Sequence, residues 1–284
     1  MNGQQAVRRI WLCADDYGIA PGVDSAIRDL VAGGRLNATS VMVLPPTFSR
    51  AEADVLARLN ADRHRVAIGL HITLTAPFRP LTVGYAPLRG GAFLSIAATL
   101  RAALLRRLDP TALAREIEAQ FGAFREVFGR APDFVDGHQH VHLFPQVRDV
   151  VLAAAARLAP GAWVRQCGSA MPLSGRLTDP KGLLVDALSR AFRARAAAAG
   201  ITTNPAFAGT YSFRAGADFA AIFPKFLDRL PDGGLIMCHP GRVDAELVRL
   251  DPLTTHRERE YAFLGGEAFA AALEHHQATL DRPA

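Results

Sequence analysis

The chain has 284 residues, of which 50% are hydrophobic and 21% are charged. This composition excludes a disordered chain, and a core of this size folds without disulfides or a structural metal. A metal site in such a chain is therefore expected to serve chemistry. The net charge is +5, and all but two of the 32 basic residues are arginine. The arginines come with few interleaved aromatics and with no zinc-finger spacing, so we expect no nucleic-acid partner.

Cysteine spacing and the N-terminal segment limit the cellular context. The three cysteines, Cys13, Cys167 and Cys238, are widely spaced and form no CxxC pair, so we expect small buried side chains. The apolar run after Arg8-Arg9 is shorter than the roughly 7–15 residues of a secretory signal. No apolar run is long enough for a transmembrane segment. We expect a cytoplasmic protein and leave a homo-oligomer open.

Strand and helix patterns alternate in the first half of the chain. The first helix has Pro21 in its first turn and ends before Gly33-Gly34. Another begins at a capping box that opens with Ser49. In chain order we expect a strand at Val7–Ala14, a helix at Pro21–Ala32, a strand at Ala38–Val43, a helix from Ser49 to Ala61 and a strand at Val66–Leu70.

The same alternation continues to the C-terminus. A long helix is predicted from Pro110 to Phe128, because Leu113, Ile117 and Phe121 recur at helical spacing. After it we expect a strand at Phe134–Asp136, a helix at Pro145–Leu158, a strand at Trp163–Arg165, helices at Gly182–Ala199 and Asp218–Leu230, a strand at Leu235–Cys238, and helices at Thr255–Phe263 and Glu267–Leu280.

This alternation predicts a parallel sheet covered by helices. About seven strands in a chain of this length fit a (β/α) TIM-like barrel better than a small open sheet. Because no low-complexity linker divides the chain, we expect residues 1–284 to form a single α/β domain. The least regular stretch, residues 75–93, is rich in proline and glycine, and it is either a substrate loop or a plain surface insertion.

Polar residues follow four of the predicted strands. In α/β barrels the catalytic groups lie at the carboxyl ends of the strands. Five of the nine histidines and two adjacent aspartates occur at such ends. The four runs are Ala14-Asp15-Asp16-Tyr17-Gly18, Gly69-Leu70-His71, Asp136-Gly137-His138-Gln139-His140-Val141-His142 and Cys238-His239-Pro240-Gly241. Acids and imidazoles that meet at one rim are typical of a divalent-metal site.

Each run also has a purely structural interpretation. Adjacent carboxylates after a strand often cap a helix, and a lone His71 or His239 is often a structural histidine. The three histidines between 138 and 142 are harder to dismiss, although a histidine-rich surface loop stays open. Paired aspartates can divide labour, because one binds a metal while its neighbour accepts a proton. A histidine whose pKa lies near working pH can then protonate a leaving group.

In content and order, these motifs resemble those of the YdjC/ChbG-like carbohydrate deacetylases, which include the hopanoid-associated HpnK group. The resemblance spans residues 14 to 241. It implies a distorted (β/α) barrel and an Asp-His-His site for Mg²⁺ or Zn²⁺. It also implies hydrolysis of the N-acetyl group of an acetylated amino sugar, such as a chito-oligosaccharide or a glycosaminyl lipid.

The resemblance also implies roles for single residues. It assigns the metal to Asp16, His71 and His138, the general base to Asp15 and the general acid to His239. An arginine orients the base in the related polysaccharide deacetylases, and Arg165 is the matching residue. The remaining candidates, as alternative ligands or as support for the ligands, are His140, His142 and Asp136. Residues 75–80 differ from the glycine-containing loop of the family, which leaves the substrate open.

Three other functions stay open at this point. One is another metal-dependent hydrolase, an amidohydrolase or phosphoesterase; amidohydrolases usually carry the His-x-His pair on their first strand, whereas here Asp15-Asp16 follows that strand. A second is a non-haem Fe(II) enzyme with two histidines and one carboxylate. The third is a non-enzymatic nucleic-acid-binding module, suggested only by the basic charge.

Overall fold

Seven parallel strands form the central sheet of the computed structural model, which describes residues 6–61, 66–170, 180–212 and 216–281. The order across the sheet is β6-β5-β4-β3-β2-β8-β7. The strands are β2 (Trp11–Tyr17), β3 (Ala38–Val41), β4 (Ala67–Ile72), β5 (Phe134–Gly137), β6 (Trp163–Val164), β7 (Phe207–Ala208) and β8 (Leu235–Cys238). Because all pairs are parallel, the carboxyl ends of the strands share one rim.

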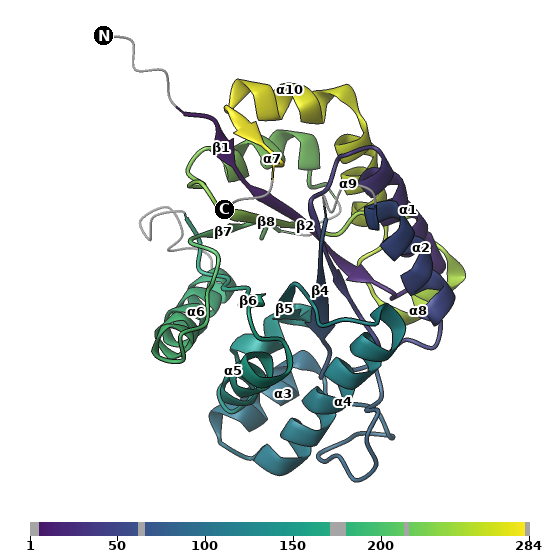
Figure 1. Ribbon diagram of the computed structural model, residues 1–284, viewed down its shortest axis with the longest axis vertical. Coiled ribbons are helices and arrows are strands. Elements are labelled where there is room, and N and C mark those ends of the chain that lie inside the picture. The colour runs from purple at the N-terminus through teal and green to yellow at the C-terminus, as the bar shows by residue number, and fades with distance from the viewer. Residues whose placement is uncertain (1–5, 62–65, 171–179, 213–215, 282–284) are drawn as a thin grey trace.

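The two edges of the sheet approach each other. Parallel bridges join Val164 to Thr203 and Ser169 to Phe207, which connects the β6 side to the segment that leads into β7. The result is an irregular (β/α) barrel in one domain, as the sequence predicts. A separate pair joins β1 (Arg8–Arg9) to β9 (Ala278–Thr279) beside α10 (Figure 1), so the first and last strands of the chain run in parallel.

Helices surround this sheet (Figure 1). They are α1 (Pro21–Ala32), α2 (Arg50–Ala61), α3 (Ile96–Leu104), α4 (Pro110–Phe128), α5 (Val147–Leu158), α6 (Pro180–Ala198), α7 (Phe219–Leu227), α8 (Ala245–Leu250), α9 (Thr255–Gly265) and α10 (Glu267–His275), with the short 3-10 helix η1 (His138–Leu143). In α4, Asp109 accepts a hydrogen bond from the Thr111 N–H at the start, and Gly129 ends the helix in a left-handed conformation.

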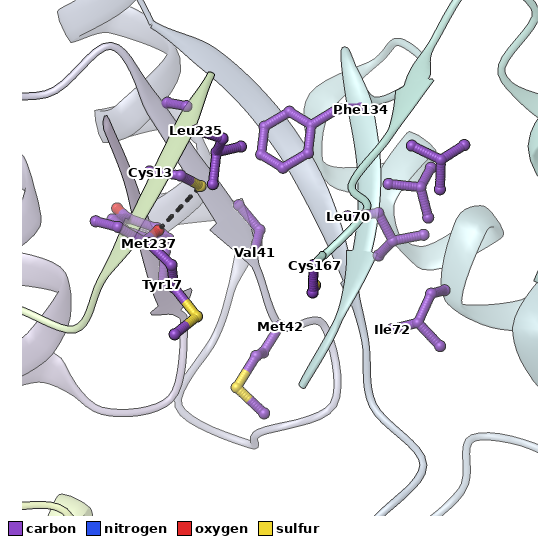
Figure 2. Packing of buried hydrophobic residues seen from close by; sticks show 14 of the residues in the cluster. Cys13, Tyr17, Val41, Met42, Leu70, Ile72, Phe134, Cys167, Leu235 and Met237 are labelled. Atoms are coloured by element: carbon purple, nitrogen blue, oxygen red, sulfur yellow. Dashed lines mark hydrogen bonds between the residues drawn. The ribbon is translucent and has the colours of Figure 1, made fainter. Parts of the chain in front are cut away.

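Alternation along the strands separates the barrel interior from the helix-facing side. Figure 2 shows Phe134 and Leu235 projecting into the space between the two sides of the sheet, while Leu70 and Ile72 point away from it. Gly69 makes room for the ring of Phe134, because a Cβ at this position would lie 2.4 Å from that ring. The small residue therefore lets an aromatic side chain fill the interior directly below the rim.

The main differences from the sequence prediction are short or C-terminal elements. The predicted strand Val7–Ala14 is two strands, of which β2 continues through the aspartates to Tyr17. The predicted helix Glu267–Leu280 ends at His275, and the chain then pairs with β1. Besides η1 and β9, the elements that the sequence reading missed are α3, β7 and α8. Strand β7 and helix α8 are too short for their hydrophobic pattern to be recognised. Helix α3 is a run of mostly alanine and leucine without a clear polar face.

Candidate active site

A break in the strand ladder aims both aspartates at one site. On β2, Ala14 pairs with Thr39 and Tyr17 pairs with Val41, so two residues of β2 lie opposite one residue of β3. Asp16 has φ +70°, a left-handed conformation that is uncommon outside glycine. In a regular strand, adjacent side chains point to opposite faces. The bulge removes this alternation, and both Asp15 and Asp16 line the same cavity.

Asp16, His71 and His138 lie together at the carboxyl ends of three strands. Asp16 Oδ1 is 3.3 Å from His71 Nε2 and 2.9 Å from His138 Nδ1. One ligand atom from each residue lies within 4.8 Å of the others, and all three side chains are buried. Two imidazoles and a carboxylate at such distances are the donor set of a Zn²⁺ or Fe²⁺ site with open positions. The residues present therefore fit the metal that the resemblance implies.

Asp136 supports this group from behind. Its Oδ1 lies 2.6 Å from His71 Nδ1, which leaves Nε2 facing Asp16. Burial would lower the pKa of His71, but the surrounding carboxylates, Asp136 first, raise that pKa to about 10. Burial would likewise raise the pKa of Asp16, yet His138 and Arg257 hold it well below its ordinary value. A carboxylate behind a metal-ligating histidine is a common arrangement that fixes the ring orientation.

Arg165 binds the carboxylate of Asp15. Its guanidinium donates to Asp15 Oδ2 at 2.7 Å and to Asp15 Oδ1 at 2.6 Å, and it forms an ion pair of 2.5 Å with Asp136. Burial would raise the pKa of Asp15, but Arg165 outweighs this and holds the pKa well below its ordinary value. Asp15 is therefore ionised and fixed in orientation. Cys13, Asp15 and Asp136 also form a cluster of metal-ligating type, but the Arg165 cation lies among them.

The three histidines of η1 go to three different places. Gln139 and His140 have left-handed backbone angles, so the imidazoles share neither an extended nor a helical face. His138 joins Asp16 and His71. His140 lines the cavity with its Nδ1 3.4 Å from Cys167 Sγ. His142 is fully buried, with Nε2 2.9 Å from the Arg165 carbonyl oxygen. The structure thus separates His138 from the two alternative ligands.

Helix α9 contributes two buried charges that the sequence reading missed. Arg257 donates to Asp16 Oδ2 and to Asp251 Oδ2, both at 2.6 Å. One turn later, Glu260 accepts from the backbone N–H of His239 at 2.5 Å and from the Tyr211 hydroxyl at 2.6 Å. Both charged side chains have no exposed surface. The only sequence signal is a predicted helix whose residues 255–260 are all polar, without the apolar stripe that packing against a barrel requires.

These groups surround a cavity of about 380 Å³ at the rim. Asp15, Asp16, His71 and His138 line it together with His239, so four strand ends contribute to one space. A volume of several hundred Å³ is typical of a small-molecule site. Of the nine site residues predicted from the sequence, Arg165, Asp136 and His142 lie behind the cavity wall and the other six line it.

The stretch 75–93 touches the site from outside. Phe78 packs edge-on against His138, with ring centroids 5.7 Å apart. Glu116 on α4 anchors the stretch by accepting from the backbone N–H groups of Leu81 and Thr82, at 3.1 and 2.9 Å. Among the described residues that line the cavity, none belongs to 75–93. A substrate-binding role for this stretch stays a prediction.

Comparison with known proteins places the chain in a family. The family model described as "YdjC-like protein" matches residues 9–275. The chain belongs to the YdjC-like protein family. The human protein named carbohydrate deacetylase is 35% identical over 150 residues, which cover 51% of this chain and 45% of that protein. The chitooligosaccharide deacetylase of Yersinia pestis (strain Pestoides F) is 34% identical over 142 residues, 50% of this chain and 53% of that protein.

The matched stretch spans about half the length of these curated relatives. A solved structure from Enterococcus faecalis V583, whose name refers to cellobiose-phosphate cleavage, superposes with a TM-score of 0.75. It is 20% identical, and the match covers 98% of both chains. At this identity the similarity shows the fold, which agrees with the barrel described above. Within the described ranges, no helix is both long and apolar enough to span a membrane.

Proposed function

We propose that this YdjC-like protein is a metal-dependent hydrolase that removes the N-acetyl group from an acetylated amino sugar. The observation that carries the proposal is the convergence of Asp16, His71 and His138. Beside them lies Asp15, both of whose carboxylate oxygens accept hydrogen bonds from Arg165. The names of the curated relatives, carbohydrate and chitooligosaccharide deacetylase, support the substrate class. The substrate is a chito-oligosaccharide or a glycosaminyl lipid.

Asp16 Oδ1, His71 Nε2 and His138 Nδ1 would hold the metal. Imidazole donors suit Zn²⁺ better than Mg²⁺, which prefers oxygen ligands, although the family resemblance allows both. A divalent cation in such a site supplies Lewis acidity that polarises a carbonyl and lowers the pKa of water. Arg257 holds the other oxygen of Asp16, so that Oδ1 faces the two imidazoles.

The other residues of the chain handle protons and position. Asp15 is unprotonated and held in orientation by Arg165, so its carboxylate is available to accept the proton of the attacking water. His239 lines the same cavity, and its backbone is fixed by Glu260. From this position we assign His239 to donate a proton to the departing amine. The products of adding one water to the acetamide are acetate and the free amino sugar.

Acetate release from a panel of N-acetylated sugars and glycolipids, with and without a chelator, tests the proposal. We expect release that the chelator abolishes and that added Zn²⁺ or Mg²⁺ restores. Assaying phosphate release on the same samples separates a deacetylase from a phosphoesterase. Chelator-insensitive acetate release would contradict the metal assignment, and phosphate release without acetate would contradict the reaction.

Asp15→Asn tests the base. It should lower turnover by about 10²- to 10⁴-fold, the usual contribution of a general base, while the variant still binds metal. Asp232→Asn is the matched control, because the Asp232 side chain is 52% exposed and pairs with Arg9 at the surface. Turnover of Asp15→Asn close to that of the control would show that Asp15 is not the base.

A further inference from the structure

Five arginines and six aliphatic side chains are exposed on the segment between β4 and α4. We call this set the Arg79–Arg107 surface. It contains six of the ten large hydrophobic side chains that are exposed among the described residues, and Val83 is 95% exposed. Its members are Arg79, Arg89, Arg101, Arg106 and Arg107, with Leu81, Val83, Leu88, Ile96, Leu104 and Leu105. Exposed apolar side chains concentrated on one segment of the chain are typical of an interaction surface.

The charge of this segment has one sign. No aspartate or glutamate occurs between Asp62 and Asp109, although the chain has 27 acidic residues in 284, or about one in ten. None of the five arginines forms an ion pair with a carboxylate among the described residues; Arg79 donates only to the Gly90 carbonyl oxygen, at 3.4 Å. Glu116, which anchors the segment, is fully buried and accepts from backbone groups. The surface therefore presents unneutralised positive charge.

The local fold holds these side chains outward. Tyr85 and Phe93 pack edge-to-face at 5.0 Å, and a backbone hydrogen bond of 2.9 Å joins Phe93 to Phe78. Helix α3 buries Thr99 and Ala103 and leaves Arg101 and Leu104 on its solvent side. The aromatic residues thus turn inward, while aliphatic and guanidinium groups remain outside. Figure 1 shows this segment with α3 at the lower edge of the molecule.

We propose that the Arg79–Arg107 surface docks on an anionic lipid bilayer. Guanidinium groups bind lipid phosphates, and exposed aliphatic side chains enter the boundary between headgroups and acyl chains. Proteins that bind single-stranded nucleic acid usually add exposed aromatic rings on which bases stack. Here all three aromatic residues of the segment, Phe78, Tyr85 and Phe93, are at most 6% exposed. Lipid is therefore the partner that this combination of residues fits.

The docking surface is connected to the candidate active site. Its segment begins directly after β4, which carries His71, and Phe78 contacts the ring of His138. A bilayer bound here would lie beside the rim of the barrel that carries the site. This inference concerns binding and does not depend on the proposed deacetylation.

Sedimentation of the full chain with vesicles tests the proposal. One vesicle type mixes phosphatidylglycerol with phosphatidylcholine, and the other is pure phosphatidylcholine. We expect binding to the mixed vesicles at low salt, weaker binding at high salt and little binding to the neutral ones. Arg106→Gln should weaken binding about fivefold, since each basic residue near an anionic surface contributes about 1 kcal/mol. Val83→Asp should weaken it further, because it also adds a negative charge.

Matched controls exist on other faces of the molecule. Arg193→Gln changes an exposed arginine of α6, and Val248→Asp changes a valine of α8 that is 62% exposed. Both should bind mixed vesicles like the unaltered chain. The proposal fails if the chain ignores mixed vesicles, binds both vesicle types equally, or is weakened as much by the controls. A dimer in light scattering that Val83→Asp dissociates, without vesicle binding, would instead assign the surface to a second copy. Acetate release, measured in parallel, reports separately on the proposed function.

Discussion

Replacing Arg165 tests whether the buried ion pair with Asp15 stabilises the fold. Arg165→Gln removes both hydrogen bonds to Asp15 and the 2.5 Å ion pair with Asp136. Asp136 retains His71 Nδ1 at 2.6 Å, but within the described ranges Asp15 retains only two weak donors, the Ser40 hydroxyl at 3.3 Å and the Cys13 thiol at 3.6 Å. Asp15 is 2% exposed, so water can reach the carboxylate only from the cavity side. The carboxylate is then buried almost without compensation.

Breaking a buried pair on one side typically costs about 3–5 kcal/mol, whereas an exposed pair contributes about 0–1 kcal/mol. Arg165→Gln should therefore lower the free energy of unfolding by about 3–5 kcal/mol at neutral pH. Arg165→Lys keeps the charge without the fork and should cost less. Arg9→Gln, which breaks the exposed pair with Asp232, is the control and should leave the free energy of unfolding nearly unchanged.

Urea unfolding of the four proteins, repeated from neutral to acid pH, measures these differences. Asp15 has a folded-state pKa below its ordinary 3.8, so the stability from the pair is present above about pH 4 and is lost as the pH falls through the folded-state value. The difference in the free energy of unfolding between the unaltered chain and Arg165→Gln should accordingly become smaller at acid pH. A loss as small as that of Arg9→Gln, or a gap independent of pH, would refute the reasoning.

Two further predictions concern His142 and Gly209. Burial lowers the pKa of His142 well below 6.5. Below pH 6.5 the unfolded chain therefore binds a proton at this residue while the folded chain does not. The free energy of unfolding falls with decreasing pH by up to about 1.4 kcal/mol per pH unit. His142→Gln should flatten this decline in urea unfolding, and an unchanged slope would contradict it. Gly209 has φ +107°, and a Cβ there would lie 2.2 Å from the Met237 carbonyl oxygen. Gly209→Ala should lower the melting temperature more than Gly161→Ala, which has φ +89° and no neighbour within 4 Å; equal losses would show that conformation alone decides.

The sequence predicts the barrel because the patterns that indicate strands and helices lie within short stretches of the chain. Alternating strand and helix patterns fix a parallel sheet, and a parallel sheet brings strand ends together. This suffices to bring the four polar runs to one rim, and the family resemblance then singles out Asp16, His71 and His138. Sequence periodicity cannot indicate the left-handed angles at Gln139 and His140, which separate the three histidines of η1. It also cannot indicate β9, whose two residues pair with a strand at the opposite end of the chain.

The arginine partners lie far from the aspartates in sequence. Arg165 is 150 residues from Asp15, and Arg257 is 241 residues from Asp16. Family resemblance suggested the first pair, and nothing in the sequence suggested the second. Buried charged residues on a helix are visible in a sequence only as polar positions, and most polar helix positions face water. The support for the site therefore required the three-dimensional structure.

These two arginines give identical neighbouring side chains different chemistry. Arg165 engages both oxygens of Asp15, so this carboxylate is held as a unit and kept ionised. Arg257 engages only Oδ2 of Asp16, and Oδ1 faces His71 and His138. A metal shared with the two imidazoles therefore has an available oxygen on Asp16, whereas Asp15 would first have to loosen a bidentate pair. The arrangement of the arginines is thus the physical reason to assign the ligand to Asp16 and the base to Asp15.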